Sequence, residues 1–203
     1  MLVNRTLAVA MMAAVTLSLG CRIESNKQGN SDNVKIATPF GGMSVKTNDA
    51  VVQEGTGLPP YPGAELVKNN KDSGAADVNM SFGSFQLRVK AVSYRSNDAP
   101  EQVAAFYRKA LARYGDVIEC SNGKPVGTPA RTAEGLGCEN DNGNNHVNLN
   151  DEMTGKMEFK AGSKQHQHIV GVDPDGGGTK FGLVALDLPG HVTIGDDNGG
   201  SKQ

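Results

Sequence analysis

The sequence predicts an α+β fold in which an antiparallel sheet packs against one main amphipathic helix at about residues 98–115. Asp77–Phe82 and Phe85–Tyr94 alternate apolar and polar residues around Gly83-Ser84, a pair that suits a type II′ hairpin turn. A stretch with apolar residues at helical spacing follows this hairpin. Glycine contributes 26 of the 203 residues, which favours a chain of strands and turns.

The hairpin around Gly83-Ser84 has a defined register. Pairing across the turn places three apolar pairs on one face and polar pairs on the other, ending with Asp77 opposite Lys90. The apolar pairs are Phe82 with Phe85, Met80 with Leu87, and Val78 with Val89. A slip of one residue would move every apolar side chain to the polar face, so the pattern specifies the register. The apolar face of this sheet needs a cover.

The helix that follows is predicted to supply that cover. Asp98 is a favourable N-cap, and Glu101 stands three residues later, as in a capping box. Gly115 can end the helix in a left-handed conformation. The apolar stripe between these ends has the spacing of one helix face and consists of Val103, Phe106, Tyr107, Ala110, Leu111 and Tyr114.

Composition divides the rest of the chain. Val34–Thr47 is expected to form a hairpin with Gly41-Gly42 as its turn, so that Phe40 faces Met43. A lone hairpin is marginal in water, so this one must dock on the main domain or on a partner. The predicted units are a signal peptide at 1–20, a lipidated polar tether at 21–33, the hairpin and a linker at 34–57, an α+β domain at 58–190, and a flexible tail at 191–203.

The first residues have the anatomy of a secretory signal, with basic Arg5, an apolar stretch at Leu7–Leu19 and small residues before Cys21. The apolar stretch is shorter than the roughly 20 residues of a membrane-spanning helix. Leu17-Ser18-Leu19-Gly20-Cys21 resembles the lipobox of bacterial lipoproteins, although Ser18 stands where leucine is commonest. The resemblance implies diacylglycerol on the Cys21 sulfur and acyl chains such as palmitate. Plain secretion is the alternative.

The chain has three cysteines, an odd number for an exported protein. If lipid occupies Cys21, Cys120 and Cys138 remain to form a disulfide in an oxidising compartment. A loop of this length contributes about 3 kcal/mol when it is closed. The alternative, a catalytic or metal-binding pair, lacks Cys-x-x-Cys spacing and a second cluster of ligands.

A second resemblance covers about half of the chain. Tyr61-Pro-Gly-Ala64, the hairpin, and Phe106–Gly115 with the strand after it resemble uncharacterised bacterial lipoproteins and secreted α+β domains. The resemblance implies an envelope protein of unknown role that is anchored in a membrane and faces the periplasm. Arg22, rather than aspartate, follows Cys21, which by resemblance to enterobacterial sorting rules favours the outer membrane over the inner one.

Two histidines form the constellation that most resembles a chemical site. His166 and His168 share one face of a predicted strand, so their imidazoles could bind a metal ion with a third ligand. The candidates for that ligand are His146, His191, Asp173 and Asp175. Closing the last hairpin with Val172 opposite Thr179 would place His168 beside Leu183 and His166 beside Ala185.

These observations predict a non-enzymatic binding or structural module without a cofactor. Its expected partners are the membrane, through lipid on Cys21, and an unknown envelope protein. The net charge of −2 gives no electrostatic case for binding nucleic acid. Two alternatives remain: a metal-dependent hydrolase that uses His166 and His168, and a carrier whose apolar pocket between sheet and helix is lined by Phe106, Tyr107 and Met80.

Overall fold

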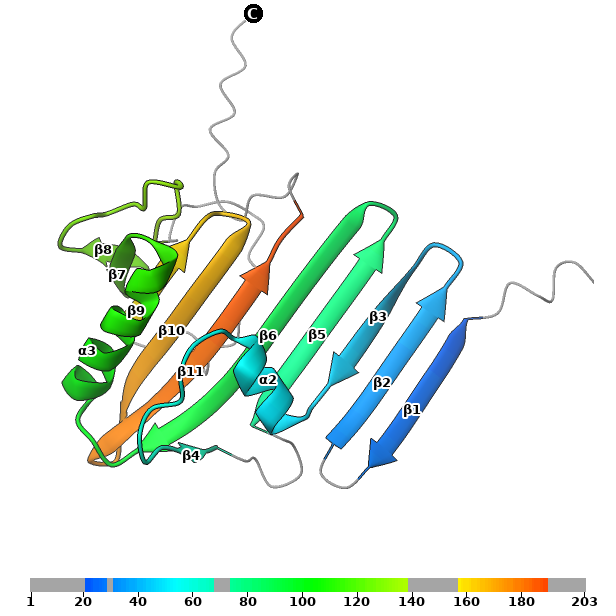
Figure 1. The fold of residues 1–203 in the computed structure, drawn as a ribbon, viewed down its shortest axis with the longest axis horizontal. Helices are drawn as coiled ribbons and strands as arrows, with labels where there is room; N and C mark the ends of the chain where they lie inside the picture. The colour runs from blue at the N-terminus through cyan, green and yellow to red at the C-terminus, as the bar shows by residue number, and fades with distance from the viewer. Residues whose placement is uncertain (1–20, 29–30, 68–73, 139–156, 190–203) are drawn as a thin grey trace, which may run out of the picture.

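The computed structural model describes residues 21–28, 31–67, 74–138 and 157–189 of the 203-residue chain. These residues form one long antiparallel sheet with two helices on one of its faces (Figure 1). The α+β class predicted from the sequence is confirmed. Within the described ranges, no helix is long and apolar enough to cross a bilayer.

The sheet has eleven strands in the order β1-β2-β3-β5-β6-β11-β10-β9-β7-β8, with β4 also paired to β6. The strands are β1 (Arg22–Gln28), β2 (Ser31–Thr38), β3 (Gly41–Lys46), β4 (Glu65–Leu66), β5 (Ala75–Phe82), β6 (Phe85–Ser96), β7 (Val117–Ser121), β8 (Lys124–Val126), β9 (Met157–Gly162), β10 (His166–Asp175) and β11 (Gly178–Asp187). The helices are α2 (Asp49–Gly55) and α3 (Pro100–Leu111), and α3 continues into the 3₁₀ turn η1 (Ala112–Tyr114).

The β5–β6 hairpin has the predicted register. Phe82 pairs with Phe85 across Gly83-Ser84, and the pairing continues inward to Asp77 and Lys90. Gly83 has a φ of +58°, which the turn requires and glycine adopts without strain. Lys90 Nζ lies 3.8 Å from a carboxylate oxygen of Asp77, so the predicted pair of unlike charges is present.

Helix α3 carries the predicted apolar stripe, but its start differs from the prediction. Val103, Tyr107 and Leu111 are fully buried in the core. The helix begins at Pro100 after Ala99, and no side chain caps it. The predicted capping box is therefore wrong, because Asp98 instead accepts a hydrogen bond of 2.7 Å from the Tyr61 hydroxyl. Gly115 ends the turn with a positive φ of +111°.

The helix covers a different part of the sheet from the one predicted. It packs on β9, β10 and β11, where Phe159, Val170 and Leu183 form a buried row that β6 continues with Val92. Side chains alternate between faces along a strand, so Val92 and Tyr94 face the helix while Leu87 and Val89 face away. The three apolar pairs of the hairpin thus lie on the face opposite α3, and the prediction that α3 covers them is wrong.

The segment after Cys21 is part of the sheet. The residues expected to form an unstructured tether make β1, which pairs with β2 from Arg22↔Ala37 onward. The hairpin expected at 34–47 docks on the domain itself, because β3 pairs with β5. The polar composition that suggested a tether reflects an edge strand whose side chains, from Arg22 to Asn26, are exposed.

The turn of the β2–β3 hairpin lies two residues before the predicted one. Pro39 and Phe40 form the turn, and Thr38 pairs with Gly41. Gly41 belongs in the strand because a Cβ there would lie 2.1 Å from the Ser81 carbonyl oxygen of β5. Close packing of β3 on β5 therefore decides the register, and the predicted pairing of Phe40 with Met43 is wrong.

Helix α2 occupies part of the segment expected to be a linker. The side chain of Asn48 caps its first turn by accepting a hydrogen bond of 3.2 Å from the Val51 amide. Val52 is fully buried in the same core as α3. This one anchor, together with contacts to β5 and β6, holds a helix too short to show clear periodicity in the sequence.

The last hairpin turns at Gly176-Gly177. Each residue of its first strand pairs with a residue two positions later in the sequence than predicted. His168 pairs with Ala185 and His166 with Asp187, rather than with Leu183 and Ala185. His166 and His168 are two residues apart on β10, so they share a face, as predicted, whichever residues they pair with.

The predicted disulfide is present. Cys120 and Cys138 are bonded with a Cα–Cα distance of 5.7 Å, and Cys120 packs with Ile118 and Leu136 in a second small core. The predicted signal peptide at 1–20 and tail at 191–203 lie outside the described residues.

Reduction of this disulfide is expected to lower the free energy of unfolding by about 3 kcal/mol, because the two cysteines are 18 positions apart in the sequence. Urea unfolding with and without dithiothreitol measures the difference. The double variant Cys120→Ala/Cys138→Ala is the control, since reductant should not change its stability. Equal stability of the oxidised and reduced wild type would contradict the prediction.

Candidate functional site

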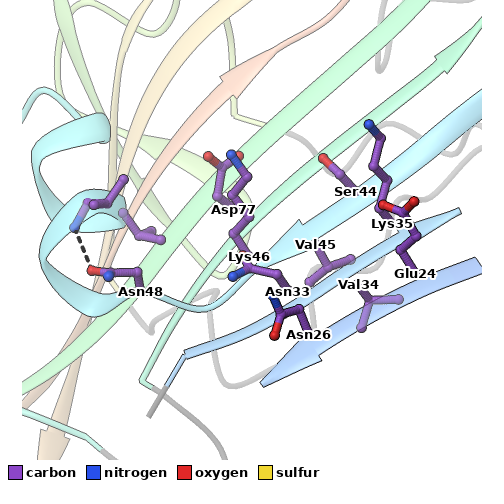
Figure 2. A pocket seen from close by; sticks show the side chains of 12 residues that line it. Glu24, Asn26, Asn33, Val34, Lys35, Ser44, Val45, Lys46, Asn48 and Asp77 are labelled. Atoms are coloured by element: carbon purple, nitrogen blue, oxygen red, sulfur yellow. Dashed lines mark hydrogen bonds between the residues drawn. The ribbon is translucent and has the colours of Figure 1, made fainter. Parts of the chain in front are cut away.

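A groove of about 650 Å³ lies beside α2 on the helix-bearing face of the sheet (Figure 2). Strands β1, β2, β3 and β5 form its floor, and Val51 of α2 lies at its side. Its polar lining consists of Glu24, Asn26, Asn33, Lys35, Ser44, Lys46, Asn48 and Asp77. Such a concentration of amide and charged groups suits a polar ligand rather than an apolar one.

Strand register brings these side chains together from distant parts of the sequence. One row across the sheet runs through Asn26, Asn33, Lys46 and Asp77, and each pairs directly with the next. A second row runs through Glu24, Lys35 and Ser44. Directly paired residues share a face, so both rows point into the groove.

The charges of the groove differ in how well they are compensated. Asp77 has Lys90 as its partner, and Glu24 lies 2.7 Å from the guanidinium of Arg22. Lys35 and Lys46 are exposed and form no ion pair with other described residues. Their amines are therefore the groups best placed to bind a carboxylate of a ligand, while the asparagine amides can donate and accept hydrogen bonds.

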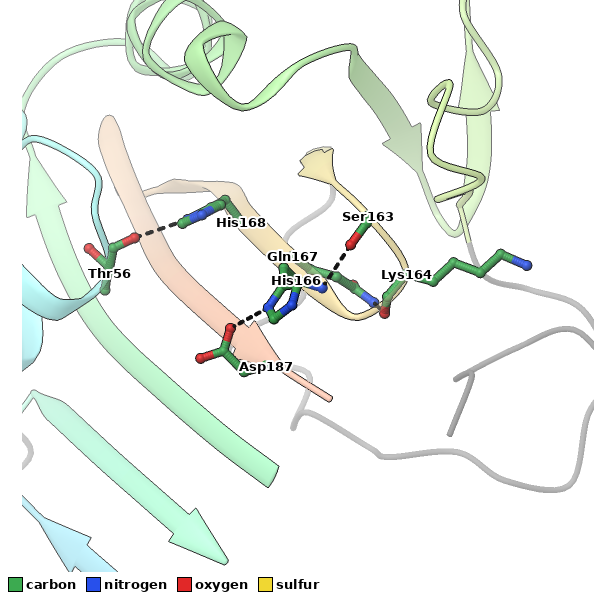
Figure 3. A network of polar contacts seen from close by, with 7 residues as sticks. All are labelled: Thr56, Ser163, Lys164, His166, Gln167, His168 and Asp187. Carbon is green, nitrogen blue, oxygen red and sulfur yellow. Dashed lines mark hydrogen bonds and ion pairs between the residues drawn. The ribbon is translucent and has the colours of Figure 1, made fainter. Parts of the chain in front are cut away.

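A contact between three elements holds α2 beside the groove. His168 Nδ1 lies 3.0 Å from the carbonyl oxygen of Thr56, the residue that ends α2 (Figure 3). The His168 ring stacks on Tyr114 with a centroid distance of 3.5 Å. The Tyr114 hydroxyl donates a hydrogen bond of 2.6 Å to the carbonyl of Gly57. Strand β10 and the end of α3 thus fix the end of α2.

Gly57 is needed at this contact. Its φ of +71° lies in the left-handed region, and a Cβ there would come within 2.5 Å of the Tyr114 hydroxyl. A larger residue would be strained and would push α2 away from Tyr114.

The two histidines have separate structural partners. His166 Nδ1 lies 2.9 Å from a carboxylate oxygen of Asp187, and His168 bonds to Thr56 (Figure 3). Asp175, a candidate third ligand, lies at the other end of β10 and pairs with Arg95. In the described ranges no three histidine, cysteine, aspartate or glutamate side chains are grouped to hold a metal ion. His146 and His191 lie outside those ranges.

Of the three residues predicted to line a carrier pocket, Phe106 and Tyr107 are in contact, but Met80 lies apart from them. Tyr107 is fully buried in an aromatic cluster, and its ring contacts those of Tyr61, Phe106 and Phe181. Met80 belongs to the apolar pairs on the opposite face. Aromatic side chains fill the space between α3 and the sheet where a ligand was expected.

Cys21 is exposed and not disulfide-bonded, and it stands immediately before β1. The lipidation site predicted from the sequence therefore adjoins an edge strand of the sheet.

The groove was not predicted from the sequence, although a signal for it exists. Asn33 and Lys35 alternate with apolar residues on β2, and Ser44 and Lys46 do so on β3. This alternation resembles that of Asp77 and Asn79 on β5. Recognising β2, β3 and β5 as neighbours would have placed their polar faces side by side.

Comparison with protein-family models, with curated proteins and with solved structures found no match to this chain. Its function must therefore be inferred from the geometry of its own residues.

The His168 contact predicts how stability depends on pH. Burial lowers the pKa of His168, and the hydrogen bond to Thr56 opposes this only in part. The folded protein thus binds a proton at His168 less readily than the unfolded chain, whose histidines have a pKa of about 6.5. The stabilisation is complete above that value and is lost as the pH falls through the lower pKa of the folded state.

Urea unfolding at pH 7.5 and pH 5.0 tests this expectation. The wild type should lose stability between these two pH values. Protonation of His168 should lower the free energy of unfolding by at most about 1.4 kcal/mol per pH unit. His168→Gln, which keeps a donor for Thr56, should lose less. Nearby His166 and Asp187 remain in both proteins and serve as the internal control. An equal loss in the two proteins would contradict the prediction.

Proposed function

We propose that this protein is a lipid-anchored, non-enzymatic binding module of the bacterial cell envelope. The observation that carries the proposal is the division of its cysteines. Cys120 and Cys138 are joined in a disulfide, while Cys21, which ends the lipobox-like sequence, is exposed and free to carry lipid. Disulfides of this kind persist in oxidising compartments, which supports a domain that faces the periplasm. The outer membrane is favoured because Arg22, rather than aspartate, follows Cys21.

The groove beside α2 is the proposed binding site. Lys35 and Lys46 would bind carboxylates, Glu24 would accept from an amine, and the asparagines would bond to amide groups. A ligand with all three groups is a polar, extended segment of an envelope protein. Val51 of α2 is 53% exposed at the side of the groove and would contact an apolar side chain of that segment.

The partners of the titratable side chains support a role without catalysis. His166 and His168 bond to Asp187 and Thr56, and these contacts hold strands and α2 in place. Glu158 lies 2.8 Å from Lys160 in a largely buried ion pair. Each of these groups already serves the fold, so a general acid or base would have to be taken from a structural contact.

The anchor is tested by Cys21→Ser. Cells grown with radiolabelled palmitate should label the wild type and leave Cys21→Ser unlabelled, because the thioether needs the sulfur. The variant should also move from the detergent phase to the aqueous phase on phase separation. Cys120→Ala/Cys138→Ala is the matched control and should keep its label. Equal labelling of wild type and Cys21→Ser would refute the lipid anchor.

The groove is tested by photocrosslinking in the native envelope. A photoreactive benzoylphenylalanine in place of Ser44 should form an adduct with an envelope protein, whereas the same residue in place of Lys109 on α3 should not. Lys35→Gln/Lys46→Gln should reduce the Ser44 adduct at least tenfold without lowering the melting temperature, because both lysines are exposed and glutamine adds no negative charge opposite Glu24 or Asp77. An adduct that persists at full yield in this charge-neutral variant would exclude the lysine charges from binding.

A further inference from the structure

Three apolar side chains are exposed at one end of the sheet. The exposed fractions are 83% for Phe40, 67% for Ile23 and 47% for Phe82. Phe40 is in the β2–β3 turn, Phe82 adjoins the β5–β6 turn, and Ile23 is the second residue of β1. Large apolar side chains that gather in one exposed place indicate a surface that contacts something.

Strand pairing places these residues at the same end. Arg22 pairs with Ala37 just before the β2–β3 turn, and Gly41 just after that turn pairs with Phe82. The start of β1 and the two hairpin turns accordingly lie along one margin of the sheet, at the top of Figure 1. Cys21 immediately precedes Arg22, so the proposed lipid site is on this margin too.

The two hairpin ends are in contact. The Phe82 ring lies over Gly41, where a Cβ would come within 2.6 Å of its Cδ1 atom. Phe85 pairs with Phe82 across the β5–β6 turn and is partly buried. The phenylalanines thus form part of one surface, which we define as the aromatic margin: Ile23, Phe40, Phe82 and Phe85.

We infer that the aromatic margin contacts the lipid bilayer, with Phe40 and Phe82 inserted among the headgroups and the upper acyl chains. The inference rests on the proposed anchor, because lipid on Cys21 would bring acyl chains to the margin without an intervening tether. Transfer of an exposed phenylalanine side chain from water to an apolar phase is favourable, because it removes a large apolar surface from water. The start of β1, next to the anchor, then lies at the membrane surface, and the sheet stands on the membrane by this end.

The charges at the margin favour an apolar contact over an electrostatic one. Arg22 is paired with Glu24 at 2.7 Å, so the positive charge of Arg22 at the start of β1 is compensated. Binding should therefore depend little on anionic lipid or on salt, unlike that of a polybasic segment.

Tryptophan fluorescence tests the contact, since the chain contains no tryptophan. Phe40→Trp and Phe82→Trp each place a single reporter in the margin. Val126→Trp is the matched control, because Val126 is 46% exposed, much like Phe82, but belongs to β8 at the far edge of the sheet. The purified full-length lipidated proteins are reconstituted into phosphatidylcholine vesicles with brominated acyl chains.

Bromolipid should quench the tryptophans at 40 and 82 at least twofold relative to vesicles without bromine, and leave the one at 126 unchanged. The same quenching should occur in vesicles with added phosphatidylglycerol. Bromolipid quenching that is equal at all three positions, or absent from all three, overturns the inference. A tryptophan at 40 that is shielded only as protein concentration rises, without quenching by bromolipid, also overturns it, because a second copy of the chain would then be the occupant.

Palmitate labelling of the same proteins separates this inference from the anchor. Labelled protein with unquenched tryptophans at 40 and 82 overturns the membrane contact and leaves the anchor intact. Unlabelled protein overturns the anchor, and quenching at 40 and 82 but not at 126 would still support contact of the margin with lipid.

Discussion

The register of the β5–β6 hairpin is the constraint on which the rest of the structure depends. Strand β6 is twelve residues long and pairs with β5 on one side and β11 on the other. The Gly83-Ser84 turn fixes which side chains of β6 point to each face. Val92 and Tyr94 are thereby directed to the core under α3, while Lys90 on the same face is directed to Asp77 and α2.

The two helices cover only part of the face that β6 defines. Helix α3 packs on β9–β11 and α2 on β5 and β6, so the same face of β1–β3 carries no described helix. That part must then interact with water or with a ligand, and its side chains are amides and charges. The groove arises where the covered and uncovered parts meet, beside Asn48 and Val51. The groove lies at this place because α2 is short and covers only part of a long sheet.

Features fixed by neighbours in sequence could be predicted. The Gly83-Ser84 hairpin, the stripe of α3 and the Cys120–Cys138 bond all depend on local spacing or on counting cysteines. Features fixed by distant contacts could not. Helix α2 depends on His168, which bonds to Thr56 across 112 residues, and the β2–β3 register depends on Gly41 beside Ser81 of β5. The groove needs residues from four strands and a helix, so no single stretch announces it.

The position of Cys21 links the proposed anchor to the groove. Strand β1 leaves Cys21 in the direction away from the aromatic margin, and a strand rises about 3.3 Å per residue, so Asn26 stands about 16 Å along the strand from Cys21. A sheet held by this end on a membrane would present its faces sideways. The groove would then open beside the membrane rather than onto it. A partner segment that lies along the membrane surface could reach Lys35 and Lys46 without entering the lipid. A lipid headgroup, which stays within the membrane, could not reach these two lysines.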